Sequence, residues 1–378
     1  MKTYGCSSVS EFIQDRIVYR NLEPVDQDLP SLTDYWAQTG QPSLSIPRKH
    51  EPLYAKYIAW LLRFALQQDA PGSILRRVLF IGDTRLSDAT AFDHICQAGN
   101  WIGTIFIGAD RSSQAGSSIE PTPGGQELFQ ATRWAGLRDF ENYLHEKRFP
   151  IDESTAVLID LDKTAIGARG RNDHVIDQAR VQAIQDTVQG LLGERFNQPA
   201  FLAAYGRLDR PEFHPFTLDN QDYLSYICLI LGSGFTSLER LLEGTESGET
   251  RSFFDWIEQV ESRKSRLDPA LREIHSEILA LVRAGDPTPF KAFRRNEYLA
   301  TSSRMGCLPD GARVDELLEQ EIVITEEVRR QALAWQSQGA LIFGLSDKPD
   351  EASIPTPQQA QAGMQPLHRI QTHSVGSE

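Results

Sequence analysis

The stretch Ala156-Val157-Leu158-Ile159-Asp160-Leu161-Asp162-Lys163-Thr164 decides the fold class of this chain. It begins with an uninterrupted apolar run, which is typical of a parallel strand covered by helices on both faces. The run ends at Asp160 and Asp162, on alternate positions that point to one side of a strand. Open α/β sheets bind ligands beyond the carboxyl ends of such strands. The stretch therefore predicts two carboxylates at a sheet edge; the alternative is that Asp160 begins a turn and Asp162 caps a helix.

Two further apolar runs end in polar groups in the same way. Residues 77–81 run into Gly82, Asp83 and, five residues later, Asp88, and residues 340–345 run into Ser346-Asp347-Lys348-Pro349. The second run follows a helical stretch, 326–338, that ends at a glycine, as expected of a helix C-cap. Helix and strand patterns also alternate over residues 49–110, with a further strand at 101–108. The sequence predicts a doubly wound, Rossmann-like parallel sheet.

The three strand ends together resemble motifs of the haloacid dehalogenase superfamily. Asp-x-Asp-x-Thr at 160–164, Gly-Asp-x-x-x-x-Asp at 82–88 and Ser-Asp-Lys-Pro at 346–349 are similar to its first, fourth and second motifs. The third motif, a lysine before the helix that leads to the fourth-motif strand, resembles Arg48-Lys49-His50-Glu51-Pro52, followed by a helical pattern at 53–67. Lys49 is the matching lysine, with Lys56 as the substitute in another register. The alternative for both lysines is a solvated surface charge.

The order of the motifs differs from that of the family. Along this chain the order is third, fourth, first, second, so the resemblance implies a circular permutation. A packed sheet tolerates this rearrangement when the termini and the new break lie in exposed connections. The implied fold is an α/β core over 1–165 and 323–378, including a lead-in segment at 1–46, with an all-helical cap inserted at 166–322.

The resemblance implies a role for each strand-end residue. Asp160 would attack phosphorus and form an aspartyl-phosphate, and Asp162 would be the general acid and base. An acid at this second position is associated with phosphatases and phosphomutases in the family. Ser346 would donate a hydrogen bond to a phosphoryl oxygen, and Lys49 would offset negative charge.

The resemblance also implies a bound Mg²⁺, because several carboxylates in one pocket need a hard cation with oxygen ligands. Asp160, the backbone carbonyl of Asp162, and Asp83 would bind the ion, and Asp88 would contact the ion or its water. The alternative for Asp88 is a cap on a helix at 89–97.

The chain departs from the family at two places near the first motif. Lys163 stands where the family has glycine, and Ala165-Ile166 where it has threonine or leucine. Lys163 would alter the loop geometry or attract an anion. Arg169 and Arg171 follow where the gating flap of the cap is expected, and arginine suits planar anions. The alternative is a solvated loop.

Residues 166–322 have helical periodicity nearly throughout. Apolar residues recur at intervals of three and four in 175–192, 222–231, 253–262, 271–284 and 314–321, and no strand is predicted there. The alternative to a cap is a second domain without a catalytic part. Elsewhere we expect a short strand at 16–19, a surface loop at 111–125, a helix at 126–146 and an edge strand within 367–375.

Composition limits the classes of function. The chain has 378 residues, 40% of them hydrophobic, and a net charge of -14, which argues against a nucleic-acid partner. Its four cysteines have no paired spacing, so neither a zinc site nor a disulfide framework is predicted. No apolar stretch is long enough to cross a membrane and no secretory signal is found, so a cytoplasmic location is expected.

The function expected from these residues is a Mg²⁺-dependent phosphatase that acts on a small phosphomonoester. One alternative is a phosphomutase, which differs only in keeping water out while the phosphoryl group returns to the substrate. Another is a non-catalytic protein that binds a phosphorylated ligand. The oligomeric state is not determined by the sequence.

Overall fold

The computed structural model describes residues 1–40, 46–112 and 114–377. The chain divides into two compact units. The core unit contains the described residues of Met1–Ser43, Pro47–Gln178 and Thr301–Glu378, and the helical unit contains Ala179–Ala300. The helical unit is thus narrower than the expected cap, because residues 166–178 and 301–322 belong to the core unit.

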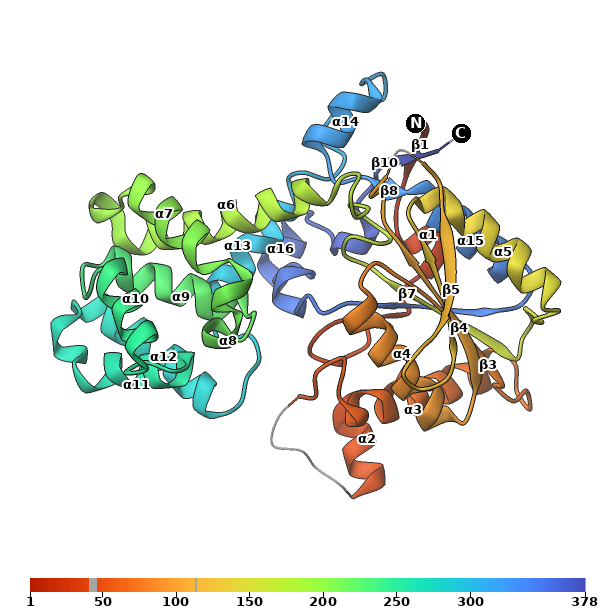
Figure 1. Cartoon of the computed structure of the whole chain (residues 1–378), viewed down its shortest axis with the longest axis horizontal. Helices are drawn as coiled ribbons and strands as arrows, with labels where there is room; N and C mark the ends of the chain where they lie inside the picture. The colour runs from red at the N-terminus through yellow and green to blue at the C-terminus, as the bar shows by residue number, and fades with distance from the viewer. Residues whose placement is uncertain (41–45, 113, 378) are drawn as a thin grey trace. The chain divides into compact units, whose positions relative to one another are not determined.

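A seven-stranded sheet forms the centre of the core unit, in the order β2-β9-β7-β3-β4-β6-β5 (Figure 1). All neighbours pair in parallel except β5 with β6. The strand bounds are β2 Ile17–Val18, β9 Leu341–Leu345, β7 Thr155–Asp160, β3 Arg77–Gly82, β4 Ile102–Gly108, β6 Glu127–Ala131 and β5 Ser117–Pro121. The strands that end before Asp83, at Asp160 and before Ser346 are therefore adjacent and parallel, which confirms that part of the sequence analysis.

Helices cover both faces of this sheet (Figure 1). On one face lie α3 (Pro52–Asp69) and α4 (Arg85–Gly99), and on the other lie α1 (Ser10–Ile13), α5 (Leu137–Glu146) and α15 (Glu326–Ser337). Every residue of β7 is buried. Burial on both faces explains its continuous apolar run and gives a mixed α/β fold with a Rossmann-like sheet.

A second, small sheet joins the first and last strands of the described chain. β1 (Lys2–Ser7) pairs antiparallel with β10 (Thr372–Gly376), which pairs in parallel with β8 (Ile324–Thr325). The expected edge strand within 367–375 therefore exists but belongs to this sheet and not to the central one. The two ends of the drawn chain lie side by side (Figure 1).

Helices make up the regular structure of the described residues between β7 and β8. They are α6 Asp173–Leu192, α7 Gln198–Leu208, α8 His214–Thr217, α9 Gln221–Gly232, α10 Leu238–Ser247, α11 Phe253–Ser262, α12 Pro269–Arg283, α13 Lys291–Ser302 and α14 Val314–Gln320. α9 is buried from Asp222 to Ile230. The ring of Tyr223 on α9 stacks on Phe253 with centroids 3.8 Å apart. The remaining helices of the core unit are α2 Leu32–Thr39 and α16 Pro357–Gln361.

Two expectations for the region before β7 are wrong. The expected loop at 111–125 contains β5, and the expected helix at 126–146 is the strand β6 followed by α5. Leu128 and Phe129 on β6 are consecutive buried residues, and Phe129 stacks on Phe106 of β4. Pairing with β4 overrides the local helical pattern at this point. No helix of the described residues is long and apolar enough to span a bilayer.

Candidate active site

A buried lysine connects two of the strand-end carboxylates. Nζ of Lys49 donates to Oδ1 of Asp88 and to Oδ1 of Asp160, each at 2.7 Å. Lys49 lies in the turn before α3, whose first residue is Pro52, and its side chain is 3% exposed. Lys56 is exposed within α3, so the structure places Lys49, and not its substitute, beside Asp160.

Asp88 anchors the turn between β3 and α4. Its Oδ1 accepts from Lys49, and its Oδ2 accepts from the backbone N–H groups of Asp83 and Thr84 and from the hydroxyl of Thr84. Asp88 therefore belongs to the carboxylate cluster and also satisfies N–H groups at the start of α4. Its two interpretations, as a residue of the acidic site and as a helix cap, are compatible. With both oxygens engaged, it has little capacity for direct contact with a metal ion.

Asp83 completes the cluster. One ligand oxygen from each of Asp83, Asp88 and Asp160 lies within 4.8 Å of the others. The guanidinium of Arg169 pairs with Oδ2 of Asp83. The side chain of Arg169 is 31% exposed and that of Asp83 is 6% exposed, so the arginine covers this buried carboxylate from the solvent side.

Burial and neighbouring charges shift the pKa values of the groups in the cluster. Burial raises the pKa of Asp160 well above its ordinary value, with Asp88 and Asp83 acting in the same direction and Lys49 opposing them. Burial and the charge of Asp88 likewise raise the pKa of Asp83 to about 6, against the effect of Arg169. Burial acts to lower the pKa of Lys49, but Asp160 and Asp88 outweigh it and raise that pKa. Lys49 is therefore a permanent cation beside carboxylates that it only partly compensates.

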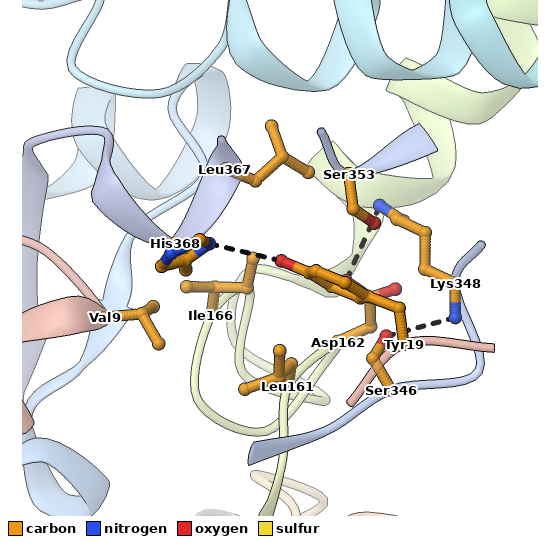
Figure 2. Close-up of a pocket in the computed structure, with 10 residues that line it drawn as sticks. All are labelled: Val9, Tyr19, Leu161, Asp162, Ile166, Ser346, Lys348, Ser353, Leu367 and His368. Atoms are coloured by element: carbon orange, nitrogen blue, oxygen red, sulfur yellow. Dashed lines mark hydrogen bonds and ion pairs between the residues drawn. The ribbon is translucent and has the colours of Figure 1, made fainter. Parts of the chain in front are cut away.

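Ser346 and Asp162 both line a small cavity, which Lys49, Asp83, Asp88 and Asp160 do not line (Figure 2). The cavity measures about 20 Å³, which is room for one water molecule. Ser346 follows β9, and its backbone N–H donates to the carbonyl of Val18 on β2. Its hydroxyl oxygen accepts from the N–H of Lys348 at 3.0 Å, which leaves the hydroxyl proton available for another acceptor.

Lys348 is a cation at this cavity that the sequence analysis quoted only as part of a motif. Its side chain is 3% exposed, and Nζ lies 3.5 Å from Oδ1 of Asp162. In Figure 2 a dashed line joins this ammonium group to Asp162. Nζ has no hydrogen-bond partner among the residues that the structure describes. Burying an ammonium group without a hydrogen bond costs free energy, and hydrogen bonds to an anionic ligand would offset that cost.

The backbone of Lys163 adopts a conformation that favours glycine. Its φ is 63°, in the left-handed region that favours glycine. Its ammonium group donates to both carboxylate oxygens of Asp177 at 2.8 Å. The ammonium group of Lys163 is therefore engaged within the protein.

Arg171 is neither solvated nor available to an anion. Its side chain is 1% exposed and forms ion pairs with Asp110 and Glu327. The interpretations of Arg171 as a substrate ligand or as part of a solvated loop are both wrong. In a short irregular loop the sequence does not show which side chains point into the protein. The sequence around these residues therefore could not predict that Arg171 would be buried and Arg169 partly exposed.

The residues present fit a hard divalent cation. Carboxylate oxygens of Asp83 and Asp160 are close together, buried and undercompensated, and oxygen is the ligand that Mg²⁺ prefers. Asp162 follows Asp160 by two residues, so its backbone carbonyl belongs to the same loop. The cluster itself does not distinguish Mg²⁺ from other cations with oxygen ligands.

Comparison with known proteins adds no relative. No protein-family model, curated protein or solved structure matches this chain. The class of protein that the fold defines is a mixed α/β protein with a Rossmann-like sheet and an acidic cluster at one sheet edge.

Proposed function

We propose that this protein is a Mg²⁺-dependent phosphatase of the haloacid dehalogenase type, which hydrolyses a small phosphomonoester through an aspartyl-phosphate on Asp160. One observation carries the proposal. Lys49, the Asp83 and Asp88 pair, and Asp160 come from three separate segments and are buried together at the carboxyl edge of the parallel sheet. A cation and a set of carboxylates at that edge are what phosphoryl transfer needs for positioning and charge stabilisation.

Asp160 is the nucleophile in this proposal. Lys49 holds Oδ1 of Asp160, and within the described part of the chain no hydrogen bond reaches Oδ2. Attack of this oxygen on phosphorus forms an acyl phosphate and breaks the bond from phosphorus to the leaving oxygen. Asp162, 24% exposed, gives its proton to that oxygen.

Hydrolysis of the intermediate reverses the proton transfer. Asp162 takes a proton from a water molecule as the water oxygen attacks phosphorus. The bond between phosphorus and the Asp160 oxygen breaks, which restores the carboxylate and releases inorganic phosphate. Because Asp162 stands on the loop just beyond β7, it serves both steps from one position.

Ser346 and Lys348 bind the phosphoryl group in this proposal. The Ser346 hydroxyl has a proton to donate, and the Lys348 ammonium group is buried beside the same cavity. Bound through Asp83, Asp160 and the carbonyl of Asp162, Mg²⁺ would supply charge neutralisation between the carboxylates and the phosphate. The helical unit, which follows the Asp162 loop in the chain, would select the substrate.

The test is phosphate release from sugar phosphates, nucleotides and an aryl phosphate, with Mg²⁺ or with a chelator. Wild type should release phosphate only with Mg²⁺, and Asp160→Asn should reduce the rate at least about 10³-fold. Asp139→Asn is the matched control, because Asp139 is an exposed carboxylate on α5. Release that survives Asp160→Asn would refute the proposal, and an isomerised phosphate ester without phosphate release would indicate a phosphomutase.

A further inference from the structure

A second cluster of metal-binding side chains lies at the small sheet. Cys6 on β1, His373 on β10 and Asp310 in the segment before α14 each offer one ligand atom, and these atoms lie within 4.8 Å of one another. The Cys6 sulfur is 3.8 Å from Oδ1 of Asp310. Cys6 and Asp310 are exposed, and His373 is buried. The three residues are far apart in the sequence, and the pairing of β1 with β10 brings Cys6 and His373 together.

A β-bulge sets the position of Cys6. Thr3 is paired with Val375, but Cys6 is paired with His373, so β1 contains one extra residue between these pairs. Gly5 in this segment has φ +87°, a conformation that glycine adopts without strain. Without the extra residue, Cys6 would stand opposite Thr372. Bulges redirect side chains in this way, and here the bulge places the thiol across from the imidazole.

His373 is held in the orientation and tautomer of a metal ligand. Its Nδ1 lies 2.8 Å from Oε1 of Glu321, which also accepts from the backbone N–H of His373. Oε2 of Glu321 accepts from the N–H of Leu308. An ionised carboxylate only accepts, so Nδ1 carries a proton and donates it to Glu321, and Nε2 is the ring nitrogen whose lone pair the neutral imidazole offers to a metal ion.

This lone pair has nothing to bind within the described residues. Nε2 of His373 is buried there without a hydrogen-bond partner, and the residue is 1% exposed. Histidine metal ligands typically donate their other ring N–H to a carboxylate, which fixes the ring. The contact with Glu321 is of this kind.

We propose that Cys6, Asp310 and His373 bind a divalent cation of the Zn²⁺ class. A set of one sulfur, one nitrogen and one oxygen donor suits Zn²⁺ and not Mg²⁺, which takes oxygen ligands. Donors around tetrahedral Zn²⁺ lie roughly 3.3–3.8 Å apart, and the exposed Cys6 and Asp310 side chains can close to that spacing. Water fills the fourth position, and the Cys6 thiol releases its proton to solvent when the metal binds.

The bound ion would tie β1 and β10 to the segment before α14. Because a ligand that binds only the folded state adds to its stability, Zn²⁺ should raise the melting temperature. This site shares no residue with the Asp83, Asp88 and Asp160 cluster, so the inference does not depend on the proposed phosphatase.

The test uses Co²⁺ as a spectroscopic probe of the full-length protein, with Zn²⁺ as competitor. A thiolate ligand gives a sulfur-to-cobalt charge-transfer band, which an all-oxygen site cannot give. We expect this band at one Co²⁺ per chain, with displacement by Zn²⁺ and a Zn²⁺-dependent rise in melting temperature. Cys6→Ser should abolish the band, and Asp310→Asn should weaken Co²⁺ binding about tenfold or more.

Cys307→Ser is the matched control, because Cys307 is also an exposed thiol and is not one of the three proposed ligands; it should keep the band. Asp160→Asn should keep it too, which separates this site from the acidic cluster. Absence of the band in wild type, its persistence in Cys6→Ser, or its loss in Cys307→Ser would each overturn the proposal.

Discussion

Nζ of Lys49 lies 2.7 Å from Oδ1 of Asp160, although 111 residues separate the two in the chain. The same nitrogen is 2.7 Å from Oδ1 of Asp88. One buried cation thus fixes the end of β7 against the turn after β3. This contact links the stability of the core unit to the proposed chemistry, because the same ammonium group serves both.

Replacing Lys49 should therefore destabilise the fold as well as stop the reaction. Lys49→Met leaves two buried carboxylates without their cation, and we expect the free energy of unfolding to fall by about 3–5 kcal/mol. Urea denaturation measures this change. Lys56→Met, at an exposed position on α3, should change it by less than about 0.5 kcal/mol. Equal stability of Lys49→Met and wild type would contradict the structural role.

Replacing Lys348 should lower activity but raise stability, whereas replacing Lys49 should lower both. Lys348→Met removes a buried ammonium group that lacks a hydrogen bond and leaves Asp162, which is partly hydrated. We expect relief of the desolvated ammonium group to outweigh loss of its 3.5 Å ion pair with the partly exposed Asp162, so that the free energy of unfolding rises by about 1–2 kcal/mol while phosphate release falls about tenfold or more. Thermal denaturation and the release assay together check this. A less stable variant with unchanged activity would refute it.

Lys163 offers a test of backbone strain near the site. Lys163→Gly and Lys163→Ala both lose the ion pair with Asp177, but only glycine suits the φ of 63°. Lys163→Gly should therefore be about 1 kcal/mol more stable than Lys163→Ala by urea denaturation, with activity close to wild type. If Lys163→Gly were no more stable than Lys163→Ala, the loop would have relaxed to another conformation.

Glu327 should contribute to acid sensitivity. Burial acts to raise the pKa of Glu327, but hydrogen bonds and charge from Arg171 outweigh it and hold that pKa below the ordinary 4.5. The unfolded chain then takes up the proton first, so this contribution to stability is present above pH 4.5 and is lost as the pH falls through the folded-state pKa.

Urea denaturation between pH 7 and pH 3 measures this contribution. Glu327→Gln should be less stable at pH 7 by about 2–4 kcal/mol and should lose less stability on acidification than wild type. Glu319→Gln, at a side chain that is 71% exposed, should follow the wild-type pH profile. A parallel pH profile for Glu327→Gln and wild type would contradict the assignment.

The central strands were predictable because their signal is local. β3, β7 and β9 are continuous apolar runs bounded by polar residues, and parallel strands buried on both faces have this pattern. β6 was missed because its five residues, Glu-Leu-Phe-Gln-Ala, have no alternation and become a strand only by pairing with β4. The helical unit was predicted as helical, but the compact unit begins at Ala179, where contacts and not periodicity set the boundary.

Some residues of the candidate sites could likewise be predicted from local sequence, and others could not. Asp83, Asp160 and Ser346 follow strands, and Lys49 precedes a helix, so their positions could be inferred from neighbouring residues. The Cys6 and His373 pair could not, because cysteine spacing is informative only when ligands are close in sequence. Their proximity depends on a bulge in β1 and on pairing between opposite ends of the chain.

The strand order also determines when the central sheet can finish forming during translation. β3, β4 and β7 are made early, so Lys49, Asp88 and Asp160 can meet on the growing chain. β9 pairs with β7 and directly precedes Ser346 and Lys348 in the chain. It is synthesised only after the whole helical unit. At roughly 5–20 residues per second this delay is on the order of ten seconds. During that time one edge of β7 has no partner strand, and such edges are templates for aggregation. Translation speed across the helical unit should therefore affect the yield of folded protein.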